Sequence, residues 1–88
     1  MRIASIETMP LFERHYRKLP KKLKEVAKER EKLFRQDAFH PSLETHKLHG
    51  KDRETWAFSI NQKYRIKFIF LPANAALFLD IGTHAIYG

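Results

Sequence analysis

The sequence predicts an α+β domain in which two amphipathic helices pack on one face of a mostly antiparallel sheet. Three observations support this class: a helical apolar period across residues 10–36, apolar and polar residues alternating along 55–70, and the apolar run ALFLDI at 76–81. The 88 residues suffice for one domain, 1–88, with one hydrophobic core. The expected order is an N-terminal strand, two helices and a three-strand antiparallel meander.

A short strand and two helices form the first half of the predicted domain. Residues 1–7 alternate loosely and predict the strand. Thr8 is a candidate helix cap, Pro10 suits a first helical turn, and Pro20 ends this helix. A second helix is expected over residues 21–36, where Lys and Glu fill the outer side. Its apolar stripe consists of Leu23, Val26, Ala27, Leu33 and Phe34.

The second half of the chain predicts a hairpin and a last strand. Residues 37–53 contain breakers and no sustained period, so we expect mostly loop there. TWAFSI at 55–60 and YRIKFIF at 64–70 alternate with period two, and NQK between them supplies the turn. A second turn, LPANA, then leads into the strand at 76–81. The side chains expected to face the helices are Trp56, Phe58, Ile60, Tyr64, Ile66, Phe68 and Phe70.

Charge and composition restrict the function classes. Seventeen Lys and Arg against ten Asp and Glu give a net charge of +7, and the pI is near 9.9. A small domain above pI 9 suits a nucleic-acid partner, although acidic proteins and membrane surfaces also attract basic domains. The absence of cysteine excludes disulfides and thiolate zinc sites. With no apolar stretch of membrane-spanning length and no signal peptide, we expect a soluble cytoplasmic protein without a membrane partner.

The face that the helices leave open is predicted to carry the functional residues. Period two puts Arg65 and Lys67 on that face, opposite the apolar residues of the same strand. The loop before the hairpin and the segment after the last strand bring further polar side chains to the same region. These are His46, Lys47, His49, Lys51 and Arg53 from the loop, and Thr83, His84 and Tyr87 from the C-terminal segment.

These residue types suit phosphate chemistry. Arginine binds phosphate oxygens with two parallel hydrogen bonds, histidine exchanges protons near neutral pH, and tyrosine stacks on bases. A metal site is the competing use of His46 and His49, but no thiolate or paired carboxylate accompanies them, so we expect no metal and no cofactor. Asp80 either holds His84 or caps the end of its strand, and we favour the cap.

Three segments, HKLHGK, TWAFSINQKYRIKFIF and LFLDIGTHAIYG, resemble the RelE/ParE superfamily of bacterial toxins. The resemblance covers essentially the whole chain, and the order of elements agrees with the compact RelE-like fold. The ending GTHAIY is similar to the YafQ-like ribonuclease branch. The resemblance implies a toxin of a type II toxin–antitoxin pair, with an antitoxin protein, mRNA and the ribosome as partners.

The activity that this resemblance implies is metal-independent cleavage of mRNA, commonly in the ribosomal decoding site. A ribose 2′-hydroxyl attacks its own 3′ phosphate, which requires a base, cations around the phosphorus and an acid for the leaving 5′ oxygen. By this resemblance Arg65 stabilises the phosphate and His84 is a general acid or base. His49 is a candidate proton acceptor. The implied RNA contacts are Lys47, Lys51, Arg53, Lys67 and Tyr87.

The sequence differs from the ribonuclease members of the superfamily at two positions, so other functions remain possible. Ala57 and Ser59 occupy open-face positions at which many ribonuclease members carry Lys, Arg or His, so activity is weaker, relies on His49 or is absent. The ParE-like branch inhibits DNA gyrase by binding, and a silent module would only bind an antitoxin or RNA. The GTH ending argues against the ParE-like branch, and removal of His84 discriminates a ribonuclease from a binder.

Overall fold

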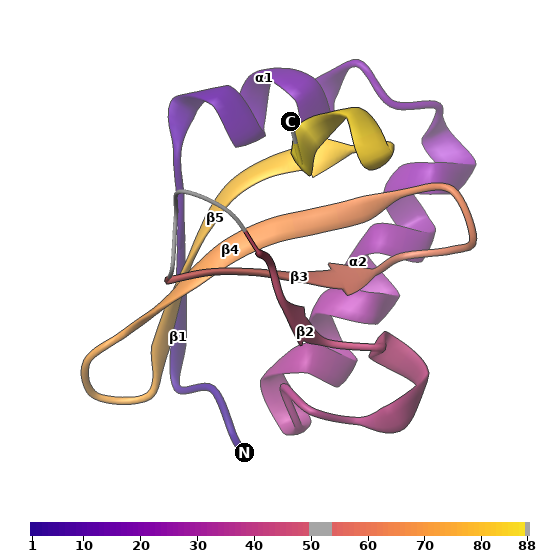
Figure 1. Ribbon diagram of the computed structural model, residues 1–88. Coiled ribbons are helices and arrows are strands. Elements are labelled where there is room, and N and C mark those ends of the chain that lie inside the picture. Colours follow the sequence, from indigo (N-terminus) through magenta and orange to yellow (C-terminus); the bar gives the residue numbers. More distant parts are fainter. Residues whose placement is uncertain (50–53, 88) are drawn as a thin grey trace.

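The computed structural model describes residues 1–49 and 54–87, which form one five-stranded sheet with both helices on the same side (Figure 1). The order of the strands in the sheet is β1-β5-β4-β3-β2; β1 runs parallel to β5, and the other pairs are antiparallel. No helix among the described residues is long and apolar enough to cross a membrane. The strands are β1 (Ser5–Thr8), β2 (His46–Lys47), β3 (Thr55–Ser59), β4 (Arg65–Leu71) and β5 (Ala75–Gly82). The helices are α1 (Pro10–Arg17), α2 (Lys21–Gln36) and the 3₁₀ turns η1 (Pro41–Leu43) and η2 (His84–Tyr87).

The predicted α+β class and the order of its main elements are confirmed, with two additions and one correction. The additions are β2, which lies in the region expected to be loop, and η2, which follows the last strand. The correction concerns Thr8, which is the last residue of β1 and not the cap of α1. Met9 is the N-cap and makes no side-chain cap bond, while the Thr8 hydroxyl donates to the Glu13 carboxylate at 2.7 Å.

The core lies between α2 and the sheet and is dominated by phenylalanine rings. Phe34 of α2 is fully buried, and its ring centroid lies 4.6 Å from that of Phe58, 4.9 Å from that of Phe68 and 5.7 Å from that of Phe78. The alternation of β3 and β4 is therefore confirmed, because Phe58 and Phe68 meet the helix. The predicted stripe of α2 is too wide at Val26, which is 39% exposed because it lies at the edge of the contact.

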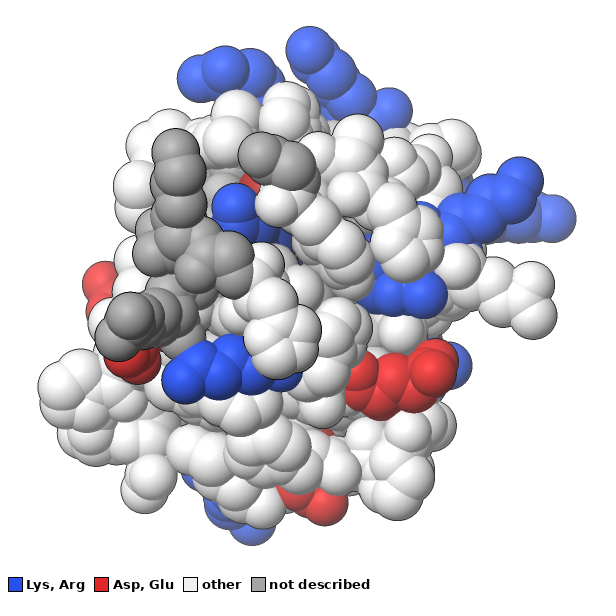
Figure 2. Space-filling view, viewed as in Figure 1, with Lys and Arg blue, Asp and Glu red and all other residues white. Residues whose placement is uncertain are grey.

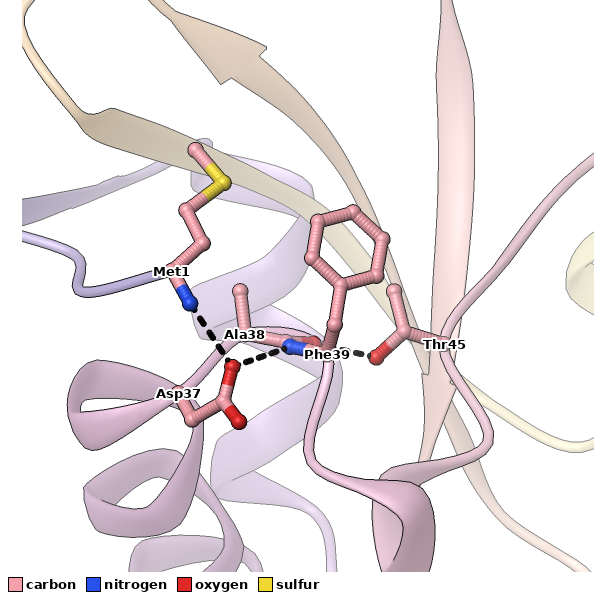
Figure 3. Close-up of polar contacts among 5 residues, drawn as sticks. All are labelled: Met1, Asp37, Ala38, Phe39 and Thr45. Atoms are coloured by element: carbon pink, nitrogen blue, oxygen red, sulfur yellow. Dashed lines mark hydrogen bonds and ion pairs between the residues drawn. The ribbon is translucent and has the colours of Figure 1, made fainter.

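The N-terminus is tied to the end of α2 (Figure 3). The Met1 ammonium donates to the Asp37 carboxylate at 2.9 Å, and the Phe39 backbone N–H donates to the same oxygen at 3.0 Å. The N-terminal hydrogen bond, followed by the Phe39 N–H, lowers the pKa of Asp37. The Thr45 hydroxyl donates to the Ala38 carbonyl at 2.6 Å, so the segment after α2 is held to the same point.

The pairing of β4 with β5 is irregular next to Asp80. Lys67 pairs with Asp80 whereas Phe68 pairs with Phe78, so one residue of β5 is left over. Asp80 Oδ1 lies 2.6 Å from Nδ1 of His15 on α1 and accepts a hydrogen bond from the Ile81 N–H at 2.8 Å. Asp80 therefore lies inside β5 and does not cap the end of the strand as expected, and its contact with His15 of α1 was not predicted from the sequence.

Candidate functional site

The open face of the sheet is built from two rows of residues that cross β3, β4 and β5. In one row Ser59 pairs with Arg65, which pairs with Gly82. In the next row Ala57 pairs with Lys67, which pairs with Asp80. Neighbours of these residues on the same strands, such as Phe58 and Phe68, are buried under α2, so the rows face away from the helices.

The C-terminal turn η2 covers the end of this open face, and Figure 1 shows it on the side of the sheet away from α2. A Cβ built on Gly82 would lie 2.7 Å from Cγ2 of Ile86, so only glycine allows the turn to pack this closely. The Lys67 ammonium donates to the Ile86 carbonyl at 3.4 Å. These contacts hold η2 over β4 and β5 and thereby place its side chains at the site.

Tyr87 lies at the centre of the residues that η2 brings to the face. Its ring centroid is 5.3 Å from that of His84 and 6.2 Å from that of His46, with both histidine rings nearly perpendicular to it. Its hydroxyl is buried and has no hydrogen-bond partner among the described residues. Burial raises the pKa of Tyr87, and the nearby charge of Arg65 opposes part of this rise, so the hydroxyl stays neutral at physiological pH.

Arg65 is oriented by the turn that precedes it. Its Nη1 donates to the Asn61 carbonyl at 2.6 Å and to the Tyr64 carbonyl at 3.0 Å. Two carbonyls neutralise none of the positive charge, and they fix one side of the planar guanidinium. Arg65 therefore keeps its positive charge, which acts on the neighbouring Tyr87 hydroxyl and can attract an anion to the open face.

The sequence predicts that His46 comes to this region but gives it no role in the reaction, and the structure places it on the open face. It lies on β2 and pairs with Ala57, which puts it in the row of Lys67. Its Nδ1 lies 2.9 Å from the Glu44 carbonyl, and a carbonyl only accepts, so Nδ1 carries the proton. The Nε2 of the neutral ring then has a free lone pair. The available signal was the short HKL pattern, which is too brief to predict a strand by periodicity.

Other predicted residues fall outside this cluster. Lys47 pairs with Trp56, a residue of the helix-covered face, so its Cβ lies on the opposite face of the sheet from Arg65. His49 is exposed two residues beyond β2. Lys51 and Arg53 lie outside the residues that the structure describes. Within residues 1–49 and 54–87, no three His, Asp or Glu side chains gather in the way that a metal ion requires.

The charge on this side of the molecule is mixed but mainly positive. Figure 2 shows Lys and Arg side chains at several places on the face that carries η2, together with smaller acidic areas. The net charge of +7 gives the whole chain a positive field that attracts polyanions. The site thus joins a charged guanidinium, an ammonium, two imidazoles and a phenol, which together can bind a phosphate and move protons beside it.

Comparisons with known proteins give matches in structure alone. No family model and no curated protein sequence matches the chain. A chain of the archaeal RelE–RelB complex from Pyrococcus horikoshii OT3 superposes with a TM-score of 0.75 at 13% identity, covering 94% of this chain and 96% of that one.

Two further solved structures agree with this match. One is the YoeB/ParE toxin from Agrobacterium tumefaciens, with a TM-score of 0.77 at 11% identity, covering 96% of this chain and 99% of the other. The second is a chain of the E. coli DinJ–YafQ toxin–antitoxin complex, with a TM-score of 0.72 at 18% identity, covering 98% and 97%. This chain therefore has the fold of the RelE/ParE toxin superfamily.

Proposed function

We propose that the chain is the toxin of a type II toxin–antitoxin pair and that it cleaves mRNA on the translating ribosome without a metal ion. The observation that carries this proposal is the cluster of Arg65, Lys67, His46, His84 and Tyr87 on the open face of a RelE-like sheet. Similarity in fold to the solved toxin structures supports the proposal that the chain is a toxin.

The proposed reaction is an internal phosphoryl transfer. The ribose 2′ oxygen forms a bond to the adjacent phosphorus, and the bond from phosphorus to the 5′ oxygen breaks. The 2′-hydroxyl gives its proton to a base of the protein, and an acid of the protein gives a proton to the leaving 5′ oxygen. The products are a 2′,3′-cyclic phosphate, which water opens to a 3′ phosphate, and a 5′-hydroxyl end.

The site supplies a group for each requirement. Arg65 and Lys67 oppose the charge that gathers on the phosphate oxygens in the transition state. His84 is exposed at the rim of the site and forms one half of the acid–base pair. His46, whose Nε2 has a free lone pair, or His49 forms the other half. Tyr87 positions His84 and presents its ring to a base.

The proposed roles require no side chain from Ala57 or Ser59, the two β3 positions at which many ribonuclease members carry Lys, Arg or His. Both residues are buried, Ala57 fully and Ser59 at 5% exposure, so neither offers a side chain to solvent. The cations of the site come instead from β4, and its histidines come from β2 and η2. We therefore expect activity without a cation on β3.

Mapping of RNA ends tests the proposal. We would map mRNA 5′ ends by primer extension in cells that express the wild type, His84→Ala or, as a control, Arg14→Ala, an exposed residue of α1 outside the cluster. The proposal predicts cuts within translated messages and growth arrest for the wild type and the control. His84→Ala should lose about 10²- to 10⁴-fold in cleavage. Cuts that are indifferent to His84 would contradict it.

Gyrase inhibition is the second candidate function. It is favoured by the match to a structure described as a YoeB/ParE toxin, because a ParE-like protein acts by binding alone. Growth arrest with inhibited supercoiling, no RNA cuts and no effect of His84→Ala would identify this function. A non-catalytic module would give neither arrest nor cuts.

An antitoxin is the proposed protein partner. The net charge of +7 favours an acid-bearing segment, and Met9 and Leu11, at 42% and 40% exposure, leave apolar surface at the start of α1 for an amphipathic one. The matched RelE and YafQ chains come from complexes with RelB and DinJ. Co-expression with the neighbouring gene should give a complex that co-purifies, and separate elution of the two products would count against it.

A further inference from the structure

A shallow groove of about 350 Å³ lies where η1, α2 and the β3–β4 turn meet. Its volume is in the range of small-molecule sites. The groove adjoins the candidate site, because its lining residue Ser59 pairs with Arg65 and the carbonyl of Asn61, also in its lining, binds the Arg65 guanidinium. The cleavage chemistry described above uses none of the groove's own side chains.

Arg30 forms a fixed planar surface in this groove. Its Nε donates to the Ile60 carbonyl at 3.2 Å, and its Nη1 donates to the Ser42 carbonyl at 3.4 Å and to the Ser42 hydroxyl at 3.2 Å. The two partners belong to different segments, so the guanidinium plane cannot rotate freely. Nucleobases stack on guanidinium planes, and Val26 adds apolar surface beside this one.

Glu44 supplies hydrogen-bond acceptors to the same groove. One of its carboxylate oxygens accepts from the Ser59 hydroxyl at 3.4 Å, and no ion pair to it is present within the described residues. A carboxylate pairs best with two adjacent N–H donors. Guanine offers such a pair on its Watson–Crick edge, whereas adenine, cytosine and uracil place an acceptor beside their donor.

We infer that this groove binds the base of a nucleotide next to the cleaved phosphate and prefers guanine. Arg30 stacks on the base, and the Glu44 carboxylate accepts its N1–H and N2–H. The inference rests on the proposed function for its link to cleavage. Binding of a nucleotide in the groove can nevertheless be measured without any cleavage.

Nucleotide titrations of the purified chain test the inference. We would add GMP, AMP, CMP and UMP separately and follow amide chemical shifts, so that the phosphate is constant and only the base varies. GMP should shift the amides of Ser42, Asn61 and Gln62 and bind about tenfold more tightly than the other three. Glu44→Gln should remove this preference, and Arg30→Met should weaken all four nucleotides. Glu25→Gln and Arg14→Met, exposed changes outside the groove lining, should leave the binding unchanged.

Several results would overturn the inference. Equal binding of the four nucleotides, shifts confined to other regions, or an unchanged preference in Glu44→Gln would each do so. Glu44→Gln keeps the size of an exposed side chain, so it remains informative if Arg30→Met fails to fold. If the chain prefers guanine but cuts no RNA, the groove inference stands and the proposed function is wrong. If the chain cuts RNA but nucleotides shift no amides of the groove, the proposed function stands and the groove inference is wrong.

Discussion

The two faces of the sheet differ in what fills them. On the helix-covered face, Phe34, Phe58, Phe68 and Phe78 form a closed aromatic core with ring centroids 4.6 to 6.5 Å apart. On the open face, charged and ionisable side chains lie beside the buried hydroxyl of Tyr87, which has no hydrogen-bond partner within residues 1–49 and 54–87. Burial of the core stabilises the fold, while the polar side chains of the open face contribute little to stability. The comparison predicts that changes on the two faces affect different measurements.

The largest effect is expected in the core. Phe34→Ala removes a fully buried ring that contacts three others, and it should lower the free energy of unfolding by about 3–5 kcal/mol. Phe39→Ala is the matched control, because Phe39 is 44% exposed, and it should cost about 1 kcal/mol. Denaturant unfolding of both variants gives the comparison. Equal losses would contradict the assignment of the core.

Gly82→Ala addresses the contact between the open face and η2. The new methyl group would lie 2.7 Å from Ile86, which should cost about 1–3 kcal/mol or displace the turn. Because η2 carries His84 and Tyr87, RNA cleavage should fall more than stability does. Gly82→Ala combined with Ile86→Ala should restore the cleavage. Normal cleavage by the single variant would show that the position of η2 does not matter.

Two lysines on opposite faces of the sheet, Lys67 of β4 and Lys47 of β2, allow a direct test of the difference between the faces. Lys67→Ala removes a cation from the open face and should reduce cleavage about tenfold, a change of about 1.4 kcal/mol. Lys47→Ala changes a residue whose register places it on the other face, and cleavage should change less than about twofold. The cleavage rates of the two variants and the wild type would be measured on the same mRNA and compared. A larger loss for Lys47 would mean that RNA crosses the edge of the sheet at β2.

The smallest effect on stability is expected at the N-terminus, away from the aromatic core and from the open face. The lowered pKa of Asp37 means that the folded chain keeps this carboxylate charged to a lower pH than the unfolded chain does. The stabilisation of the fold by the Asp37 carboxylate is therefore complete at a pH above the ordinary pKa of 3.8, and it disappears as the pH falls through the lower pKa of the folded chain. Asp37→Asn should be slightly less stable than the wild type at pH 6 and equal to it in strong acid. A gap that persists in strong acid would contradict this account.

The regular part of the fold could be predicted because it follows local periods. Alternation along 55–60 and 64–70 identified the hairpin, and the helical period identified α2. The register irregularity opposite Lys67 and Phe68 could not be predicted, because it depends on how β4 and β5 pair. The contact of Asp80 with His15 could not be predicted either, because it joins residues 65 positions apart.

The candidate site was predicted less completely. Arg65 and Lys67 lie on the open face, as strand alternation predicts. His84 and Tyr87 reach it on η2, a turn that the sequence did not predict. His46 was given no role in the reaction and no strand, since β2 has two residues and exists only through its pairing with β3. Lys47 was assigned to the site without a register to decide its face.

If the open face cleaves RNA, removal of the Arg65 guanidinium should abolish most of the activity without unfolding the chain. We would measure cleavage of mRNA on purified translating ribosomes by the wild type, Arg65→Ala and Arg14→Ala, an exposed arginine of α1. All three proteins should show the same unfolding transition within about 1 kcal/mol. The account predicts a loss of about 10²- to 10³-fold for Arg65→Ala and no loss for Arg14→Ala. Equal cleavage by the three proteins would contradict it.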